Sequence, residues 1–284
     1  MLRPLFIVLA VVGGCAADAW AQPSLERGNY LVNNIGACSN CHTPRLTPPT
    51  GPNLELRLSG GFQTFNEPFF TVKGSNLTPD RETGLGADAD IKRALTDGVR
   101  PNGVPLAMVM PSNFLRVLTP GDLDAVVAYL RTLPAIRNEV QPPVYKVAMP
   151  SPPVPGAERP MTEDELKDPV KQGFYLASLA HCMACHSRTS EDAPADFKNA
   201  WGKGGRVFKG PFGESTAANI SGHKEKGLGG WTDAEIKRAS TQGTSKDGRR
   251  LKPPMIDYGA YYKTWKDSEI DAVVAWMRTI PPVE

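Results

Sequence analysis

The chain has 284 residues, of which 40% are hydrophobic and 22% are charged, and its formal net charge is +2 at pH 7. This nearly neutral balance gives no support to nucleic-acid binding or to electrostatic attachment to an anionic membrane surface. The length favours two domains with packed cores, while 27 Gly and 27 Pro residues predict long loops.

Residues 1–21 have the composition of an export signal. Arg3 supplies a positive start, residues 5–12 form a short apolar core, and Ala19-Trp20-Ala21 is a small-residue cleavage site. The apolar core is too short to span a bilayer, and no later segment is apolar enough to do so. We favour cleavage, which predicts a periplasmic protein. A second interpretation stays open, because Val12-Gly13-Gly14-Cys15 resembles a lipoprotein box that would leave a lipidated Cys15 and membrane association.

The rest of the chain is an internal repeat. The segment Cys38-Ser39-Asn40-Cys41-His42 recurs as Cys182-Met183-Ala184-Cys185-His186, 144 residues later. Other matched segments keep an offset between 143 and 147 residues, from Gly28 and Gly173 to Asp124 and Asp271. A constant offset along half a chain predicts a duplicated domain. The predicted boundaries are 24–134 for the first domain, 135–160 for a linker and 161–284 for the second domain.

Both halves are predicted to begin and end with a helix. In the second half, Asp168 is a suitable helix cap and Pro169 a suitable first helical residue. Shorter helices are expected around residues 89–97 and 232–241. The final helix of each half shows apolar residues at i, i+3, i+4 and i+7, which marks one buried face. These residues are Leu123, Val126, Val127 and Leu130, and then Ile270, Val273, Val274 and Met277. No run alternates as a strand does, so the predicted class is all-α with long loops.

The segment between the halves, residues 134–160, is rich in proline. Proline fixes φ and removes a backbone donor, so this segment cannot continue the helix that precedes it. It is predicted to be a semi-rigid, extended connector that lies along the surfaces of the two domains.

The two C-x-x-C-H motifs predict two covalently bound haem c groups. Cysteines three residues apart lie on one face of a helical turn and can reach two vinyl groups, while the adjacent histidine faces the iron. Zinc would need four converging ligands, and a thioredoxin-like dithiol would need a βαβ pattern, which is missing. The predicted attachment residues are Cys38, Cys41, Cys182 and Cys185, and the predicted iron ligands are His42 and His186.

The sixth iron ligand decides between electron transfer and catalysis. Alignment of the halves brings Met110 against Met255, each in a loop before the last helix. Met108 is the alternative in the first half, although it faces a proline in the alignment. Histidine–methionine ligation occurs in cytochromes c and raises the potential of the iron. Two saturated irons favour one-electron transfer, so no catalytic residue is predicted.

For four further polar residues, the sequence provides weaker support for a contact with a haem. Asn76 and Asn219 are candidates for hydrogen bonds to haem propionates, with turn formation as an equal alternative. His181 and His223 are expected to be solvated or locally hydrogen-bonded, because neither has a histidine counterpart in the first half.

Taken together, these residues resemble the class I cytochrome c family in its two-haem form. The resemblance includes both C-x-x-C-H motifs, the Met110-Pro111 loop and the terminal helices at Tyr129-Leu130 and Trp276-Met277. The segments NLTPDRETGLG and GRRLKPPM resemble haem-c subunits of periplasmic alcohol, gluconate and nicotinate dehydrogenases. Those subunits often carry three haem domains, whereas this chain has two. The resemblance implies iron ligation by His42 with Met110 and by His186 with Met255.

Three functional hypotheses remain open. The resemblance implies a carrier whose donor is a periplasmic dehydrogenase subunit and whose acceptor is another cytochrome, a quinone-linked complex or a terminal oxidase. The alternative is a dihaem oxidoreductase with one labile haem site, similar to a thiosulfate dehydrogenase or a peroxidase. Ligation of the irons by both Met110 and Met255 would favour the carrier over the oxidoreductase. A haem-based sensor is a third hypothesis, for which the sequence shows no output domain.

Overall fold

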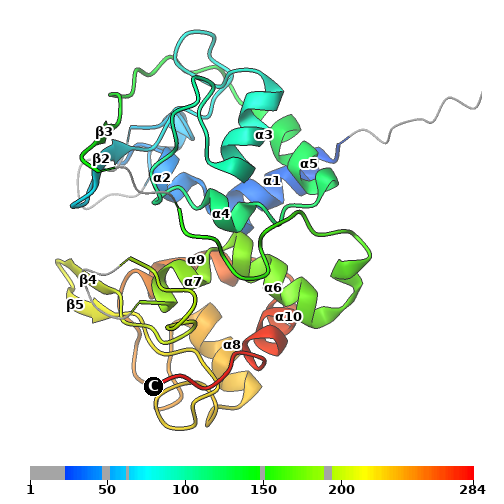
Figure 1. The fold of residues 1–284 in the computed structure, drawn as a ribbon, viewed down its shortest axis with the longest axis vertical. Helices are drawn as coiled ribbons and strands as arrows, with labels where there is room; N and C mark the ends of the chain where they lie inside the picture. Colours follow the sequence, from blue (N-terminus) through cyan, green and yellow to red (C-terminus); the bar gives the residue numbers. More distant parts are fainter. Residues whose placement is uncertain (1–22, 47–51, 62–63, 148–150, 189–193) are drawn as a thin grey trace, which may run out of the picture.

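A computed structural model describes most of the chain as two helical halves. The N-terminal half (residues 23–134) lies above the C-terminal half (residues 161–284) in Figure 1. The predicted signal segment and Cys15 lie outside the described residues. The described ranges are 23–46, 52–61, 64–147, 151–188 and 194–284. Within them, no helix combines the length and the apolar character that crossing a membrane requires.

The core of each half is a crossing of its first and last helices. In the N-terminal half, α1 (Leu25–Tyr30) continues into the π-helix η1 (Leu31–Ile35) and packs against α5 (Pro120–Arg131). In the C-terminal half, α6 (Pro169–Leu179) packs against α10 (Asp267–Met277). The predicted apolar face of α10 is buried, and on α5 only Leu123 is partly exposed. The prediction of a buried face on each final helix is therefore confirmed.

A glycine permits each of these crossings. A Cβ atom on Gly28 would lie 2.0 Å from the carbonyl oxygen of Ala125, and one on Gly173 would lie 1.9 Å from that of Ala272. Both distances are far below van der Waals contact with a backbone atom that cannot turn aside. The same close approach of the first helix to the last helix therefore occurs in both halves.

Replacing Gly173 by alanine should separate α6 from α10. We expect the free energy of unfolding to fall by about 3 kcal/mol, at the upper end of the usual cost of overpacking. Thermal or urea unfolding would measure this. The matched control is Gly121→Ala on α5, where the new Cβ would meet only Glu163 Oε1 at 3.5 Å. That control should be neutral or stabilising by up to about 1 kcal/mol, because alanine is the better helix former. Equal losses in both variants would contradict the crossing argument.

Six shorter helices and two 3₁₀ turns complete the helical part that the structure describes. The expected caps are present: Thr119 Oγ1 accepts a hydrogen bond from Asp122 N at 3.2 Å, and Asp168 Oδ1 accepts from Val170 N at 2.8 Å. The two predicted middle helices are also confirmed, as α3 and α8. The bounds are α2 (Ser39–His42), η2 (Leu54–Leu56), α3 (Asp88–Asp97), α4 (Ser112–Leu115), η3 (Glu165–Lys167), α7 (Cys182–His186), α8 (Asp233–Gln242) and α9 (Met255–Tyr262).

Short strands were not predicted, so the all-α class is wrong in this respect. The N-terminal half has an antiparallel sheet of order β1-β2-β3, and the C-terminal half has the hairpin β4-β5. Each strand has two to four residues, which is too short for alternation to be recognised in the sequence. The bounds are β1 (Thr64–Asn66), β2 (Phe70–Lys73), β3 (Val144–Tyr145), β4 (Val207–Gly210) and β5 (Gly213–Thr216).

The described residues of the proline-rich segment between the halves contact both halves. Its strand β3 pairs with β2, and Asn138 Nδ2 donates to the carbonyl oxygens of Ser59 and Gly60 at 2.9 and 3.1 Å. Further along, Val154 and Ala157 are each only 1% exposed. The linker therefore lies against the molecule, and its burial contributes to the contact between the halves.

A buried polar network joins the two halves. Arg27 of α1 donates to both carboxylate oxygens of Asp122 on α5, at 2.9 and 2.7 Å. Asp122 also accepts a hydrogen bond of 2.6 Å from the hydroxyl of Tyr175 on α6, which belongs to the other half. Tyr30 of α1 donates to Glu269 of α10 at 2.5 Å. With the edge-to-face contact of Phe114 and Phe197, whose ring centroids are 5.3 Å apart, this network fixes one half against the other.

Candidate haem sites

Both C-x-x-C-H motifs have the same backbone conformation. Each cysteine pair follows a residue in the left-handed region, Ala37 with φ of +45° and His181 with φ of +46°. A non-glycine residue is uncommon there and is often found at a functional site. The left-handed residue ends the incoming helix, and the motif then forms the short helices α2 and α7. The sequence match thus extends to the conformation of the backbone.

The two motif histidines are oriented as metal ligands. The Nδ1 atom of His42 lies 2.7 Å from the carbonyl oxygen of Ser75, and Nδ1 of His186 lies 2.7 Å from that of Ala218. A carbonyl can only accept, so Nδ1 must carry the proton and Nε2 keeps its lone pair. Metal-bound histidines are held in this way. Burial lowers the pKa of both imidazoles, which keeps them in the neutral form that binds iron.

The four motif cysteines are free thiols in apolar surroundings. Burial raises the pKa of Cys38 and of Cys182 to about 12, and that of Cys41 to about 11. A redox dithiol would need at least one thiol with a lowered pKa, and in the first motif both are raised. In the described part of the chain, no three His, Cys, Asp or Glu side chains converge as a zinc site would require. Paired, partly buried thiols beside a histidine fit covalent haem attachment.

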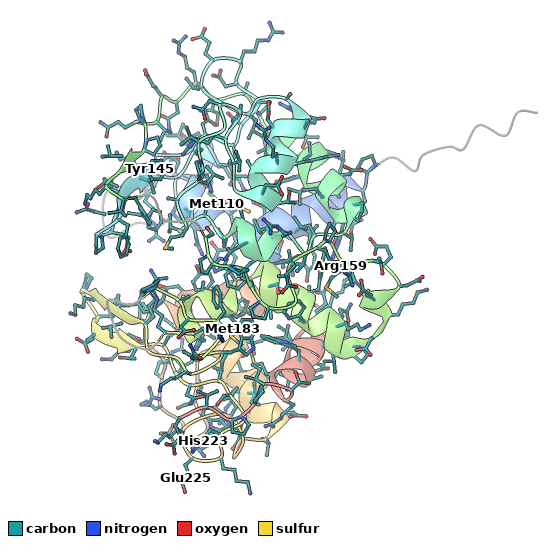
Figure 2. The ribbon with its side chains drawn as sticks, viewed as in Figure 1. Met110, Tyr145, Arg159, Met183, His223 and Glu225 are labelled. Atoms are coloured by element: carbon teal, nitrogen blue, oxygen red, sulfur yellow. The ribbon has the colours of Figure 1, made fainter. Side chains whose placement is uncertain are left out.

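The two candidate methionine ligands stand outside the hydrophobic cores. Met110 closes the turn before α4, with its N–H donating to Ala107 O at 2.9 Å, and Met255 is the first residue of α9. Both side chains are partly exposed, and neither belongs to a described core cluster. Met108, in contrast, packs against the cluster of Phe70 and Val72. Met108 thus has a packing partner, whereas Met110 (labelled in Figure 2) is available for another contact.

Several buried arginine nitrogens have no hydrogen-bond acceptor within the protein. The propionate carboxylates of a haem could supply one. The Nε atoms of Arg57, Arg100 and Arg238 are buried without a hydrogen-bond acceptor. Leaving such a donor unsatisfied costs about 1–3 kcal/mol, so these nitrogens indicate a missing anion. Arg100 lines a pocket of ≈460 Å³ with Ser75, the carbonyl partner of His42, and with the charged side chains of Lys73, Arg137, Glu82 and Glu139, so cations exceed anions there by one. The residues present therefore fit a haem with its propionates. These arginines could not be predicted from the sequence, because burial of a guanidinium cannot be inferred from its position in the chain.

The two candidate asparagines are already engaged in the protein. Asn76 Nδ2 donates to Ile136 O at 2.8 Å and to Thr83 Oγ1 at 3.1 Å, and Asn219 Nδ2 donates to Val283 O at 2.7 Å. In each half, this amide holds the chain that follows the last helix. A contact with a haem propionate would have to compete with these bonds, so the structure favours the turn alternative.

The two remaining histidines have local contacts. The ring of His181 meets that of Tyr258 edge to face, with centroids 6.0 Å apart, and burial together with Arg206 lowers its pKa to about 4. His223 Nδ1 accepts hydrogen bonds from Glu225 N and Lys226 N at 3.2 and 3.1 Å. Figure 2 places His223 at the end of the C-terminal half that is remote from the other half. The expectation of local hydrogen bonding is confirmed for His223.

Comparison with known proteins agrees with this geometry. Residues 170–281 match the family model for cytochrome c. The chain is 28% identical to the fructose dehydrogenase cytochrome subunit of Gluconobacter japonicus, over 92% of this chain and 53% of that subunit. It is 28% identical to the gluconate 2-dehydrogenase cytochrome c subunit of Pantoea cypripedii, over 82% and 55%. It is 26% identical to a diheme cytochrome c-type protein of Cereibacter sphaeroides, over 88% and 83%.

The chain thus spans about half the length of the two dehydrogenase subunits, and most of the diheme protein. The family match covers the second motif, α8, α9 and almost all of α6 and α10. Residues 170–281 therefore form a cytochrome c domain, in a chain related to the cytochrome subunits of dehydrogenases.

Proposed function

We propose that this protein is an exported dihaem c-type cytochrome that carries electrons one at a time from a dehydrogenase towards the respiratory chain. The observation that supports it most strongly is the duplicated histidine geometry. Behind each C-x-x-C-H motif, Nδ1 of His42 or His186 lies 2.7 Å from a backbone carbonyl oxygen. Histidines that bind a metal through Nε2 are usually oriented by such a bond.

Each half supplies a complete set of groups for one haem. Cys38 and Cys41 in one half, and Cys182 and Cys185 in the other, would hold the haem through thioether bonds. A bound haem would supply a reversible one-electron couple. Nε2 of each motif histidine and the sulfur of each candidate methionine, Met110 or Met255, would be the iron ligands. The Nε atoms of the buried arginines would be donors to the propionates.

Two filled axial positions favour electron transfer over catalysis. With methionine bound, neither iron has an open position for peroxide or another substrate. We propose a dehydrogenase subunit as donor, because the relatives are named as cytochrome subunits of such enzymes. The acceptor would be another cytochrome, a quinone-linked complex or a terminal oxidase. Export to the periplasm rests on the signal-like residues 1–21.

A spectroelectrochemical titration of the purified holoprotein tests this function. We expect two one-electron waves, sulfur-to-iron charge-transfer absorption in the oxidised protein, and no binding of carbon monoxide by the reduced protein. Rapid carbon monoxide binding at one haem of the unaltered protein would contradict the carrier and favour the oxidoreductase alternative.

Replacing Arg100 by leucine should lower the midpoint potential of the N-terminal haem. A cation beside the haem destabilises the more positive, oxidised state, so its loss lowers the potential. We expect a shift on the order of 50 mV, since 59 mV corresponds to 1.4 kcal/mol for one electron. Arg159→Leu is the control, because this arginine is exposed on the linker. An unchanged midpoint potential in Arg100→Leu would contradict the proposal that Arg100 lies beside the haem propionates.

A further inference from the structure

Helix α9 belongs to the C-terminal half but reaches the haem motif of the N-terminal half. The hydroxyl of Tyr261 donates a hydrogen bond of 2.8 Å to Oδ1 of Asn40. Asn40 lies between the two attachment cysteines of the first motif, directly before Cys41. One hydrogen bond therefore connects α9 to the first haem attachment site. In Figure 1, α7 and α9 lie at the boundary between the halves.

The same helix is in contact with the second motif. The ring of Tyr258 meets that of His181, the residue before Cys182, with a centroid distance of 6.0 Å. Tyr258 and Tyr262 are stacked, with centroids 6.1 Å apart and an interplanar angle of 22°. The hydroxyl of Tyr262 also interacts with the Cys182 thiol. Neighbouring tyrosines of one helix thus touch the cysteine segments of both motifs.

The residues that follow α9 hold it in this position. The indole Nε1 of Trp265 donates to the carbonyl oxygen of Asn34 at 3.1 Å, and Nδ2 of Asn34 donates to Thr264 Oγ1 at 2.7 Å. Asn34 is part of the π-helix η1, which leads into the first motif. Trp265 is 7% exposed, so this contact is part of the packed interior. The contact between α9 and the N-terminal half is therefore fixed at several points.

The aromatic residues of α9 have no equivalents in the first repeat. The corresponding segment of the N-terminal half, residues 110–117, reads MPSNFLRV, with Asn113, Arg116 and Val117 in place of the three tyrosines and Phe114 as its one aromatic residue. If these rings served only to cover a haem, both halves would need them. The tyrosines of α9 occur in one half only, next to the cysteine segments of both motifs. This indicates a function that involves both haem sites.

We propose that Tyr258, Tyr261 and Tyr262 of α9 form the electronic connection between the two haem sites, with the Tyr261–Asn40 hydrogen bond as its link across the halves. This inference rests on the proposed function, because it requires a haem at each motif. In the step, one electron leaves the reduced haem and arrives at the oxidised haem, while no bond forms or breaks and no proton moves. The rings mediate tunnelling and keep their own electrons. Burial raises the pKa of Tyr258 and of Tyr262, which keeps both phenols protonated and opposes their oxidation.

The test is the rate of electron exchange between the haems in half-reduced holoprotein, measured after flash or pulse reduction. Tyr261→Phe removes the hydrogen bond but keeps the ring, and we expect exchange to slow severalfold. The haem content and the optical spectrum of each haem should stay unchanged. Asn40→Ala removes the acceptor from the other side, together with the contact of Asn40 with Tyr258, and should slow exchange at least as much. In the double variant the slowing should not exceed that of Asn40→Ala, because the Tyr261 bond is already lost in that variant.

Tyr145→Phe is the matched control. Tyr145 lies on the linker strand β3 (labelled in Figure 2), and its hydroxyl donates to Pro105 O at 2.7 Å and not to a residue of α9 or of either motif, so exchange should be unchanged. Unchanged exchange in both Tyr261→Phe and Asn40→Ala, with two haems bound, would overturn this inference alone. A protein that carries a single haem would overturn the inference and the proposed function together. Equal slowing in Tyr145→Phe would show a general structural effect and would also overturn the inference.

Discussion

Replacing Met255 by leucine is expected to leave the haem of the C-terminal half without its sixth ligand. The iron should then bind carbon monoxide in the reduced state, and its midpoint potential should fall by ~100 mV or more, within the ~0.8 V range that axial ligation spans. The fall follows because the thioether favours the reduced iron. Met110→Leu should do the same at the other haem. Leucine conserves side-chain volume, so the fold should be retained.

Met108→Leu is the internal control for the N-terminal half. This side chain packs against Phe70 and Val72, and leucine should replace it there with little cost. The titration and carbon monoxide binding of the three variants can be compared directly. A Met108→Leu protein that loses its sixth ligand while Met110→Leu keeps it would reverse the assignment. Loss of neither ligand would exclude methionine ligation in this half.

Replacing Asp122 by alanine should have the largest effect on stability. This carboxylate accepts hydrogen bonds from Arg27 and Tyr175, and its side chain is 10% exposed. Its loss leaves a largely buried guanidinium without its main partner, which costs about 3–5 kcal/mol when a buried ion pair is broken. Because Tyr175 comes from the other half, we expect the contact between the halves to loosen in the same variant. Urea unfolding would measure the stability.

Asp164→Ala provides the comparison for this change. Asp164 pairs with Lys167 at 2.6 Å, but both side chains are exposed, and such surface pairs contribute little. This variant should unfold at the same urea concentration as the unaltered protein. Tyr175→Phe should give an intermediate loss of about 1–2 kcal/mol, since it removes the hydrogen bond to Asp122 and the long one from Thr119 N and keeps the ring. Equal stability of Asp122→Ala and Asp164→Ala would contradict the interpretation of the network.

The sequence was most informative where local chemistry determines structure. The i, i+3, i+4 pattern of the final helices and the caps at Thr119 and Asp168 depend only on neighbouring residues, and the structure contains them. The repeat added information about longer distances, because a match such as Gly28 with Gly173 indicated two equivalent helix crossings. The histidine contact with a carbonyl 32 or 33 residues away could not be predicted, since nothing in Ser75 or Ala218 marks it.

What could not be predicted depends on contacts between distant segments. Strand β3 forms only because the linker returns to β2, and its two residues carry no pattern of their own. Asn76 and Asn219 recur in register, which suggested a haem contact, but their amides hold the segments that follow the final helices. The contact of Tyr261 with Asn40 joins residues 221 positions apart. Such contacts follow from how the halves pack together.

The central claim is that each half of this chain holds one covalently attached haem. Mass spectrometry of the intact, acid-denatured protein, made in cells that mature c-type cytochromes, tests it most directly. We expect a mass increase of two haem groups. Cys41→Ala and Cys185→Ala should each change only the attachment at their own motif, as peptide mapping would show. An intact protein with no covalent haem, or with haem on one motif only, would contradict the assignment of one haem to each half.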